Sequence, residues 1–321
     1  MTVKGISVVV PFLNEEEIID RFCATLDTYQ KSFSTPLELV FVDDGSQDHT
    51  VSKIKSYKFQ YIQKIKIVSL SKNYGSHAAI RAGLLHASFN TATWMGSDLQ
   101  DPLELLELGL EKIEEGYDAV YFEKKAVEVS ITEKVFSNTY SWLMRKYAVK
   151  EFESGGINSI MLNGKILEML NHNIEPNSSI VLQILDYGYK HTTIPLDFHA
   201  RSGGKSKWTF SKKIKLFIDS FVSFSFMPIR LVSVMGILMF LAGCIIGIGT
   251  LINKLINPAV PVGYSTLASI VSLGFGITNI SLGIMAEYLW RTYDAARRRP
   301  VFLISEVIDV TDNDISGKES A

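Results

Sequence analysis

Two long uncharged segments near the C-terminal end constrain the architecture of this chain more than any other feature. The first, LVSVMGILMFLAGCIIGIGTLIN, occupies residues 231–253, and the second extends from about Pro258 to Ala286. A helix needs about 20 apolar residues to cross a bilayer, so each segment is long enough to span one. Two buried core helices are the alternative, but long, glycine-rich uncharged runs are typical of membrane helices. We expect a transmembrane hairpin over residues 229–290, with helices at about 231–253 and 264–287.

The two outer flanks of this hairpin are basic, whereas the connection between its helices offers Lys254 alone. The flanking cations are Lys205, Lys207, Lys212, Lys213, Lys215 and Arg230 on one side and Arg291, Arg297, Arg298 and Arg299 on the other. Cytoplasmic loops carry an excess of Lys and Arg. The sequence therefore places residues 1–204 and the tail 291–321 in the cytoplasm, on the inner side of the cytoplasmic membrane.

The segment 205–228 joins the two parts of the chain and combines lysines with apolar residues at helical spacing. Its apolar residues include Ile214, Phe217, Ile218 and Phe221. An ordinary domain helix is one explanation, but the position just before a membrane span favours a basic amphipathic helix in the membrane surface. The tail beyond Ile304 is polar and acidic, which predicts disorder.

The first 204 residues alternate short apolar runs with helical patterns. The expected strands are 6–13, 37–44, 65–72, 91–98 and 118–124, followed by strands within 153–163 and 190–198; the expected helices are 15–32, 48–57, 76–89, 102–115, 125–150, 164–171 and 178–187. This alternation predicts an α/β domain with a mostly parallel, Rossmann-like sheet.

Polar residues gather where four of the expected strands end. They are Asn14–Glu15–Glu16, Asp43–Asp44–Gly45–Ser46, Lys72–Asn73, and Asp98 with Asp101. Ligands of such sheets bind beyond the carboxyl ends of the strands, so we expect these clusters to converge on one edge. The DDGS stretch has a plainer explanation as a strand-end turn. Repulsion between its adjacent carboxylates favours a ligand role for at least one of them.

The segment WMGSDLQDP, residues 94–102, is the candidate metal site. Mg²⁺ and Mn²⁺ prefer oxygen ligands and bind through one or two carboxylates plus substrate phosphates. Asp98 is placed to hold such an ion against a diphosphate, and Gln100 offers a further oxygen. Asp101 precedes Pro102, so it is equally well explained as the N-cap of the next helix.

The glycine-containing basic segment RSGGKSK, residues 201–207, fits an anion site because glycines let backbone amides approach an anion and cations neutralise it. A solvated loop, or a loop that touches anionic lipid, is the alternative. Other classes of function are disfavoured. A net charge of −2 argues against a nucleic-acid partner, and two cysteines and six scattered histidines give no disulfide framework or zinc motif.

Six segments, in order, resemble the motifs of glycosyltransferase family 2, in particular its polyisoprenyl-phosphate branch with undecaprenyl- and dolichol-phosphate acceptors. The segments are VVPFLNEEE, VFVDDGSQDHT, LSKNYGSHAAIRAGLLHA, SDLQDP, RSGGKSKW and AEYLWRTYDAARRRPVF. The resemblance covers about residues 5–303. It implies a GT-A fold that binds a nucleoside-diphosphate sugar and one divalent cation, Mg²⁺ or Mn²⁺. The implied reaction is inverting transfer of the sugar to a polyisoprenyl phosphate, in the service of cell-surface glycan or lipopolysaccharide modification.

The resemblance also implies roles for individual residues. Asp98 and Gln100 would hold the metal, and Asp98, Asp101, Arg201 and Lys207 would form the catalytic set. Arg201, Gly204, Ser206 and Lys207 would face the lipid phosphate and the donor diphosphate. The nucleotide-sugar-binding set would be Pro11, Asn14, Glu15, Asp43, Asp44, Lys72, Asn73 and Lys124.

Two positions depart from the family pattern. Gly96 stands where the family has the first Asp of its DAD motif, and Lys124 stands in the region where an Arg is usual. These departures question the identity of the donor more than the type of reaction. Transfer to another glycan or lipid acceptor and a nucleotide-sugar-binding scaffold remain the alternatives. The glycines of the hairpin also permit packing against a second copy of the chain.

Overall fold

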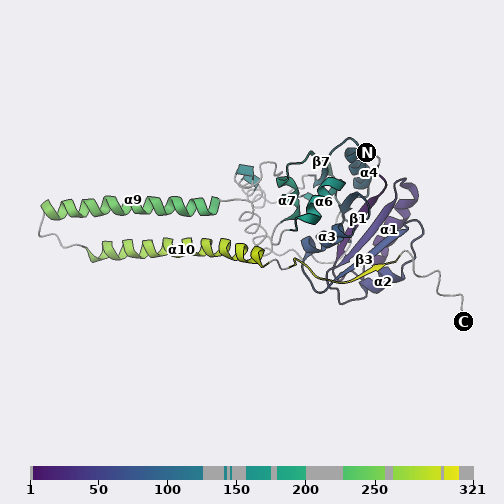
Figure 1. Cartoon of the computed structure of the whole chain (residues 1–321), viewed down its shortest axis with the longest axis horizontal. Helices are drawn as coiled ribbons and strands as arrows, with labels where there is room; N and C mark the ends of the chain where they lie inside the picture. The colour runs from purple at the N-terminus through teal and green to yellow at the C-terminus, as the bar shows by residue number, and fades with distance from the viewer. Residues whose placement is uncertain are drawn as a thin grey trace.

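The computed structural model shows an α/β domain from which two long helices project side by side (Figure 1). It describes residues 3–125, 141–142, 145–146, 157–174, 179–199, 227–256, 263–297 and 300–310. Arg201, Gly204, Ser206 and Lys207, almost all of the expected amphipathic helix and most of the expected helix 125–150 lie outside these residues.

The described strands form one sheet in the order β7-β5-β6-β4-β1-β2-β3-β8. Their bounds are β1 Ile6–Phe12, β2 Leu37–Asp43, β3 Lys64–Leu70, β4 Thr91–Trp94, β5 Ala119–Lys124, β6 Ile157–Leu162, β7 His191–Leu196 and β8 Ile304–Asp309. The pairs β4·β1, β1·β2, β2·β3 and β5·β7 are parallel, whereas β6 and β8 pair antiparallel with their neighbours. The predicted α/β domain with a mostly parallel sheet is confirmed.

Helices cover both faces of the sheet, which explains why its central strands are apolar throughout. α1, α2 and α4 pack on the face that carries Val8 and Val10, and α3, α6 and α7 pack on the face that carries Val9. The helices are α1 Ile19–Ser32, α2 Thr50–Ser56, α3 Ser76–Leu85, α4 Glu104–Glu114, α6 Gly164–His172 and α7 Ile180–Asp186. Each burial of an apolar side chain stabilises the fold by about 1.5–3 kcal/mol before the entropic cost.

Two elements next to the candidate site are shorter than the sequence predicts. The expected strand 91–98 ends at Trp94, and the expected helix 15–32 begins at Ile19. In both places polar side chains hold the backbone in a loop. Asn14 and Leu99 have positive φ angles of 51° and 58°, which interrupts regular structure there. The strand-end segments are therefore loops, which is the form that a binding site requires.

The prediction of disorder beyond Ile304 is wrong for residues 304–309. These residues form β8, which pairs antiparallel with β3 at the edge of the sheet (Figure 1). Ile304 and Ile308 pack against the two cores, and Glu306 forms a 3.7 Å ion pair with Lys55. A polar composition is compatible with a strand here because an edge strand buries few of its side chains.

The hairpin segment forms two helices, α9 Met227–Ile256 and α10 Tyr264–Ala296. They run in opposite directions beside each other, and the C-terminal end of α10 lies next to the α/β domain (Figure 1). The expected pairing of two long helices is therefore confirmed. In the described part of the chain, no helix meets the combined requirement of length and apolarity for crossing a membrane, so the two expected spans are not confirmed.

Candidate active site

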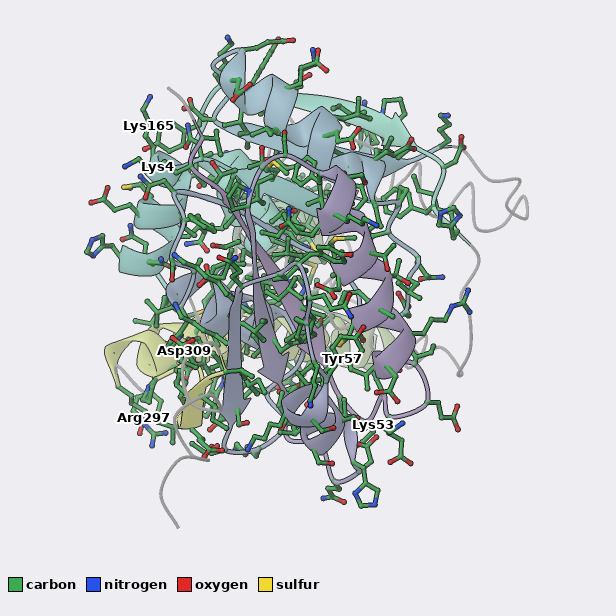
Figure 2. All side chains as sticks on the ribbon, turned by 90° about the vertical axis from the view of Figure 1, so that its right-hand side faces the viewer. Lys4, Lys53, Tyr57, Lys165, Arg297 and Asp309 are labelled. Atoms are coloured by element: carbon green, nitrogen blue, oxygen red, sulfur yellow. The ribbon has the colours of Figure 1, made fainter. Side chains whose placement is uncertain are left out.

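The parallel strands bring the four polar clusters to one edge of the sheet. β4, β1, β2 and β3 are consecutive and parallel, so their carboxyl ends point the same way. Lys4, which precedes β1, and Lys53, in α2, mark the opposite ends of these strands (Figure 2). Met95 N donates to Val9 O at 3.0 Å and Asp44 N donates to Phe12 O at 3.0 Å, which extends the pairing to the strand ends. The predicted convergence is confirmed.

Asn14 joins the loop after β1 to the loop after β2. Its backbone N–H donates to Ser46 Oγ at 2.9 Å, and its side-chain oxygen accepts from Gln47 N at 2.8 Å. The left-handed backbone at Asn14 suits this residue type, whose short side chain tolerates it. Glu15 N donates in addition to Thr50 Oγ1 at 3.0 Å. Asn14 therefore holds the loop after β1 against the loop after β2.

Asp44 ties the end of β2 to the loop after β3. Its two carboxylate oxygens accept from Tyr74 N at 2.7 Å and from Gly75 N at 2.9 Å. Burial raises the pKa of Asp44, and the neighbouring Asp43 carboxylate raises it further. Asp43 accepts from Ser46 N, within the loop after β2, at 2.8 Å. The carboxylates predicted to repel each other thus receive backbone donors from different loops.

Gly45 lets these loops approach at backbone distance. A Cβ atom at this position would lie 2.9 Å from the carbonyl carbon of Lys72, and the φ angle of Gly45 is +82°. Both the close approach and the left-handed backbone require glycine. Lys72 and Asn73 are consequently held beside Asp43 and Asp44, and both side chains are exposed.

Asp101 is buried and accepts two hydrogen bonds. Gly96 N donates to its Oδ2 at 2.6 Å and Ser159 Oγ donates to its Oδ1 at 2.9 Å. Burial raises the pKa of Asp101 to about 6, and the charge of Asp98 contributes in the same direction. The N-cap of α4 is Leu103, and no side chain caps it. Of the two explanations of Asp101, the helix cap is therefore excluded.

Gly96 leaves room for the carboxylate of Asp98. A Cβ atom at Gly96 would lie 2.9 Å from Asp98 Oδ1 and 3.5 Å from Asp101 Oδ2. Asp98 Oδ1 also accepts a long hydrogen bond from Gln100 N, at 3.4 Å, and Gln100 O accepts from His199 N at 2.9 Å. The segment 96–101 is thus a folded loop in which Asp98 lies against the glycine.

The oxygen donors of this loop fit a divalent cation only if the substrate completes its coordination. Among the described residues, no group of three or more His, Cys, Asp and Glu side chains could hold a metal ion. Asp101 lies in the interior with both oxygens engaged, so Asp98 is the carboxylate that the loop presents. Mg²⁺ is commonly bound by one or two carboxylates together with substrate phosphates and water. A site of Asp98, Gln100 and a diphosphate matches that chemistry.

Two further predicted site residues lie in the described strands. Pro11 is half-buried in β1 opposite Val42 of β2. Lys124 is exposed at the end of β5. Because β5 and β4 are each antiparallel to β6, β5 runs parallel to β4 and Lys124 reaches the same edge of the sheet as Asp98. The position of Lys124 is therefore compatible with its expected role.

The structure adds residues that sequence reasoning did not assign. Glu16 and Asp48 each accept a backbone N–H from the other's loop, and Asp48 also accepts from Thr50. Asp48 and Thr50 belong to the DDGSQDHT segment, so the motif itself could have indicated them. Ser159 follows no motif, and its contact with Asp101 spans 58 positions in the chain. No local signal could have found it.

This fold and site define a glycosyltransferase once the comparisons with known proteins are added. The sequence model of "Glycosyl transferase family 2" matches residues 7–169, and the chain belongs to that family. It is 30% identical over 303 residues to "Uncharacterized glycosyltransferase YkcC" of Bacillus subtilis, covering 94% of this chain and 93% of the relative. It is 27% identical to "Undecaprenyl-phosphate 4-deoxy-4-formamido-L-arabinose transferase" of Yersinia enterocolitica, covering 95% and 94%. The resemblance to the polyisoprenyl-phosphate branch is confirmed.

Among solved structures, a mannosyltransferase from Pyrobaculum calidifontis in complex with GDP-Man and Mn²⁺ aligns with a TM-score of 0.44 and 20% identity. The alignment covers 61% of this chain and 55% of the solved chain.

Proposed function

We propose that this glycosyltransferase moves a sugar from a nucleoside diphosphate to a polyisoprenyl phosphate, with inversion, at the cytoplasmic face of a membrane. The observation that carries the proposal is the path of the chain after α10. Leu303 O accepts from Ser71 N at 2.9 Å, and Ile304 pairs with Leu70 at the end of β3. Arg297 stands six positions before Leu303, so the two lie at most about 20 Å apart. The hairpin therefore ends within about 20 Å of Leu303, which is hydrogen-bonded to the start of the loop that carries Lys72 and Asn73.

Figure 2 agrees with this placement, because Arg297 lies toward the Lys53 end of the strands and away from the Lys4 end. An acceptor held by lipid beside the hairpin would thus lie near the edge of the sheet where the donor site is expected. The full-length relatives named as undecaprenyl-phosphate transferases favour the same class of acceptor.

The membrane part of the proposal is supported by the side chains of the two helices. More than half of the surface is exposed for each of several large apolar residues: Ile237, Leu241, Ile245, Ile248, Leu267 and Phe275. The domain end of α10 carries Trp290 and Tyr293 with ring centroids 6.0 Å apart, and Arg297 lies 5.2 Å from the Tyr293 centroid. Aromatic residues beside cations are typical of the membrane interface. The basic flanks favour a cytoplasmic catalytic domain.

The donor half of the site is assigned to the loops after β1 to β4. Asp43, Asp44, Lys72 and Asn73 are proposed to bind the nucleotide, and Asp98 and Gln100 to hold the divalent cation. A bound cation would stabilise the negative charge that develops on the departing diphosphate. Arg201, Gly204, Ser206 and Lys207 are proposed to face the lipid phosphate, and Lys124 to assist on the diphosphate side.

The acceptor chemistry requires little proton transfer. A lipid phosphate is anionic at neutral pH, so its oxygen attacks the anomeric carbon directly while the bond to the diphosphate breaks. Catalysis then depends on positioning and on charge stabilisation. Asp101 joins Gly96 to Ser159 through its two oxygens, so we assign it to holding the loop, and an anionic acceptor needs no general base.

Sugar transfer by the detergent-solubilised full-length protein tests the proposal. Labelled UDP-, GDP- and dTDP-sugars are supplied with undecaprenyl phosphate and Mn²⁺, and the lipid product is extracted and counted. Asp98→Ala is expected to abolish transfer, while Asp186→Asn, a substitution on the exposed end of α7, keeps it. Transfer to diacylglycerol or a glycan in place of the lipid phosphate would identify a different acceptor. UDP binding that Asp98→Ala leaves unaltered, with no transfer, would identify a scaffold.

A further inference from the structure

We propose that Ser159 is a positioning residue for the loop 96–101, acting on Asp98 through the carboxyl group of Asp101. The inference rests on the proposed role of Asp98 in the donor site. Ser159 lies on β6 and is 1% exposed. Its hydroxyl donates to Asp101 Oδ1 at 2.9 Å, and the other oxygen of Asp101 accepts the backbone N–H of Gly96 at 2.6 Å.

The two hydrogen bonds close the loop at its base. Gly96 begins the loop and Asp101 ends it. The hydrogen bond between them closes the loop, and Asp98 and Gln100 lie between these two residues. Asp98 lies in the loop that this hydrogen bond closes, and its Oδ1 is 2.9 Å from the position that a Cβ atom at Gly96 would occupy. A displacement of Asp101 would move Gly96 and with it the surface against which the Asp98 carboxylate rests.

The side chain of Ser159 connects β6 to the loop 96–101 where the backbone pairing of β6 with β4 has ended. β4 and β6 are joined in the register by the single pair Ala92 and Leu162. Continuing that antiparallel register by three residues sets Ser159 opposite Met95, which directly precedes the loop. Beyond Trp94 the chain leaves the strand, and the side chain of Ser159 continues the link between β6 and the loop.

Ser159 and Asp101 are both buried, so the hydrogen bond between them matters for the loop. A buried carboxyl group needs a hydrogen-bond donor for each oxygen, and removing one leaves an unsatisfied polar atom in the interior. With alanine at position 159, Asp101 Oδ1 loses the Ser159 donor, and the Gly96 N–H alone holds the carboxyl group. A partner hydrogen-bonded to a metal ligand commonly contributes about 10- to 100-fold to metal affinity; Ser159 lies one contact further out, so the lower end of that range applies.

The chain contains a matched control at the opposite end of the sheet. Ser7, in β1, is fully buried, and its hydroxyl donates to the buried carboxylate of Glu38 near the start of β2. Ser7→Ala therefore removes the same type of hydrogen bond from the same sheet, together with the acceptor of Phe89 N, without touching the loop. A general loss of stability should follow from either substitution, whereas a loss of metal affinity should follow only at position 159.

The experiment compares full-length wild type, Ser159→Ala, Ser159→Thr and Ser7→Ala in detergent. Mn²⁺ binding with UDP present is measured by calorimetry, and hydrogen exchange of residues 96–101 is measured without metal. We expect Ser159→Ala to weaken Mn²⁺ binding about tenfold and to accelerate exchange in the loop. Ser159→Thr, which retains the hydroxyl, and Ser7→Ala are expected to bind Mn²⁺ as the wild type does. If Ser159→Ala does not fold, Ser159→Cys, with its weaker donor, replaces it.

Wild-type Mn²⁺ affinity and loop exchange in Ser159→Ala would overturn the inference, as would equal losses of affinity in both alanine variants. Absence of Mn²⁺ binding by the wild type would overturn it as well. Failure of the proposed function gives a different pattern: no sugar reaches the lipid phosphate, yet Ser159→Ala still weakens Mn²⁺ binding relative to Ser7→Ala.

Discussion

Replacing Asp101 by asparagine should change how the stability of the protein depends on pH. The folded-state pKa of Asp101 is about 6, raised by burial from 3.8. A carboxyl group whose pKa is raised by folding favours the folded state when protonated. Its contribution is therefore complete below about pH 4 and is lost as the pH rises through about 6. The amide side chain of the Asp101→Asn variant would remain neutral at every pH, so the variant should lack this loss.

The size of the effect follows from the same values. The difference between 3.8 and about 6, at 1.36 kcal/mol for each pKa unit, corresponds to about 3 kcal/mol. An asparagine side chain can still accept the Gly96 N–H, and its amide can donate to Ser159 Oγ, so the hydrogen bonds need not be lost. We expect Asp101→Asn to equal the wild type near pH 4 and to exceed it in unfolding free energy by up to about 3 kcal/mol at pH 7.

Unfolding of both proteins is followed by circular dichroism between pH 4 and pH 8, in detergent and with a chelator to remove metal. Their difference at each pH cancels the titration of all other groups. Asp186→Asn, which removes an exposed carboxyl group on α7, is the control and should show a much smaller pH-dependent difference. A difference between Asp101→Asn and the wild type that stays constant from pH 4 to pH 8 would refute the reasoning.

Substitutions at two glycines and one truncation follow from the geometry of the site and the sheet. Gly45→Ala places a Cβ 2.9 Å from the Lys72 carbonyl carbon at a φ of +82°, and we expect it to lower the unfolding free energy by about 1–3 kcal/mol in thermal or denaturant unfolding. Gly96→Asp displaces the Asp98 carboxylate and adds a charge, so donor preference or metal requirement should change in a transfer assay; Gly96→Ala separates the steric part, and an unchanged profile would show that the position is idle. Truncation after Leu303 removes β8 and exposes the edge of β3, so we expect lower thermal stability and concentration-dependent aggregation by light scattering.

The sequence predicts the convergence of the site because that feature depends on alternation alone. Parallel strands joined by helices must present their carboxyl ends together, so the sequence alone assigns Asp44 and Asp98 to one edge. The two long C-terminal helices were equally evident from the length of the apolar runs.

The parts that the sequence did not predict depend on contacts between distant residues. β8 follows a polar, acidic pattern, and its pairing with β3 includes a hydrogen bond between Ser305 and Ser69 that spans 236 positions. Asp101 is compatible with an N-cap by local rules, and only the arrival of Ser159 from β6 identifies its role. Local propensity does not distinguish a strand from a disordered tail at 304–309, or a helix cap from a buried loop residue at Asp101. In both cases the difference lies in contacts with residues far away in the sequence.

The central claim is that a lipid phosphate accepts the sugar, and a comparison of two acceptors tests it most directly. The full-length enzyme is supplied with a productive labelled donor and with either undecaprenyl phosphate or undecaprenol, which has the same chain but ends in a hydroxyl group. We expect transfer to the phosphate and none to the alcohol, because the phosphate oxygen is already anionic at neutral pH whereas the hydroxyl group must lose a proton to attack. Equal transfer to both lipids, or transfer to undecaprenol alone, would contradict it.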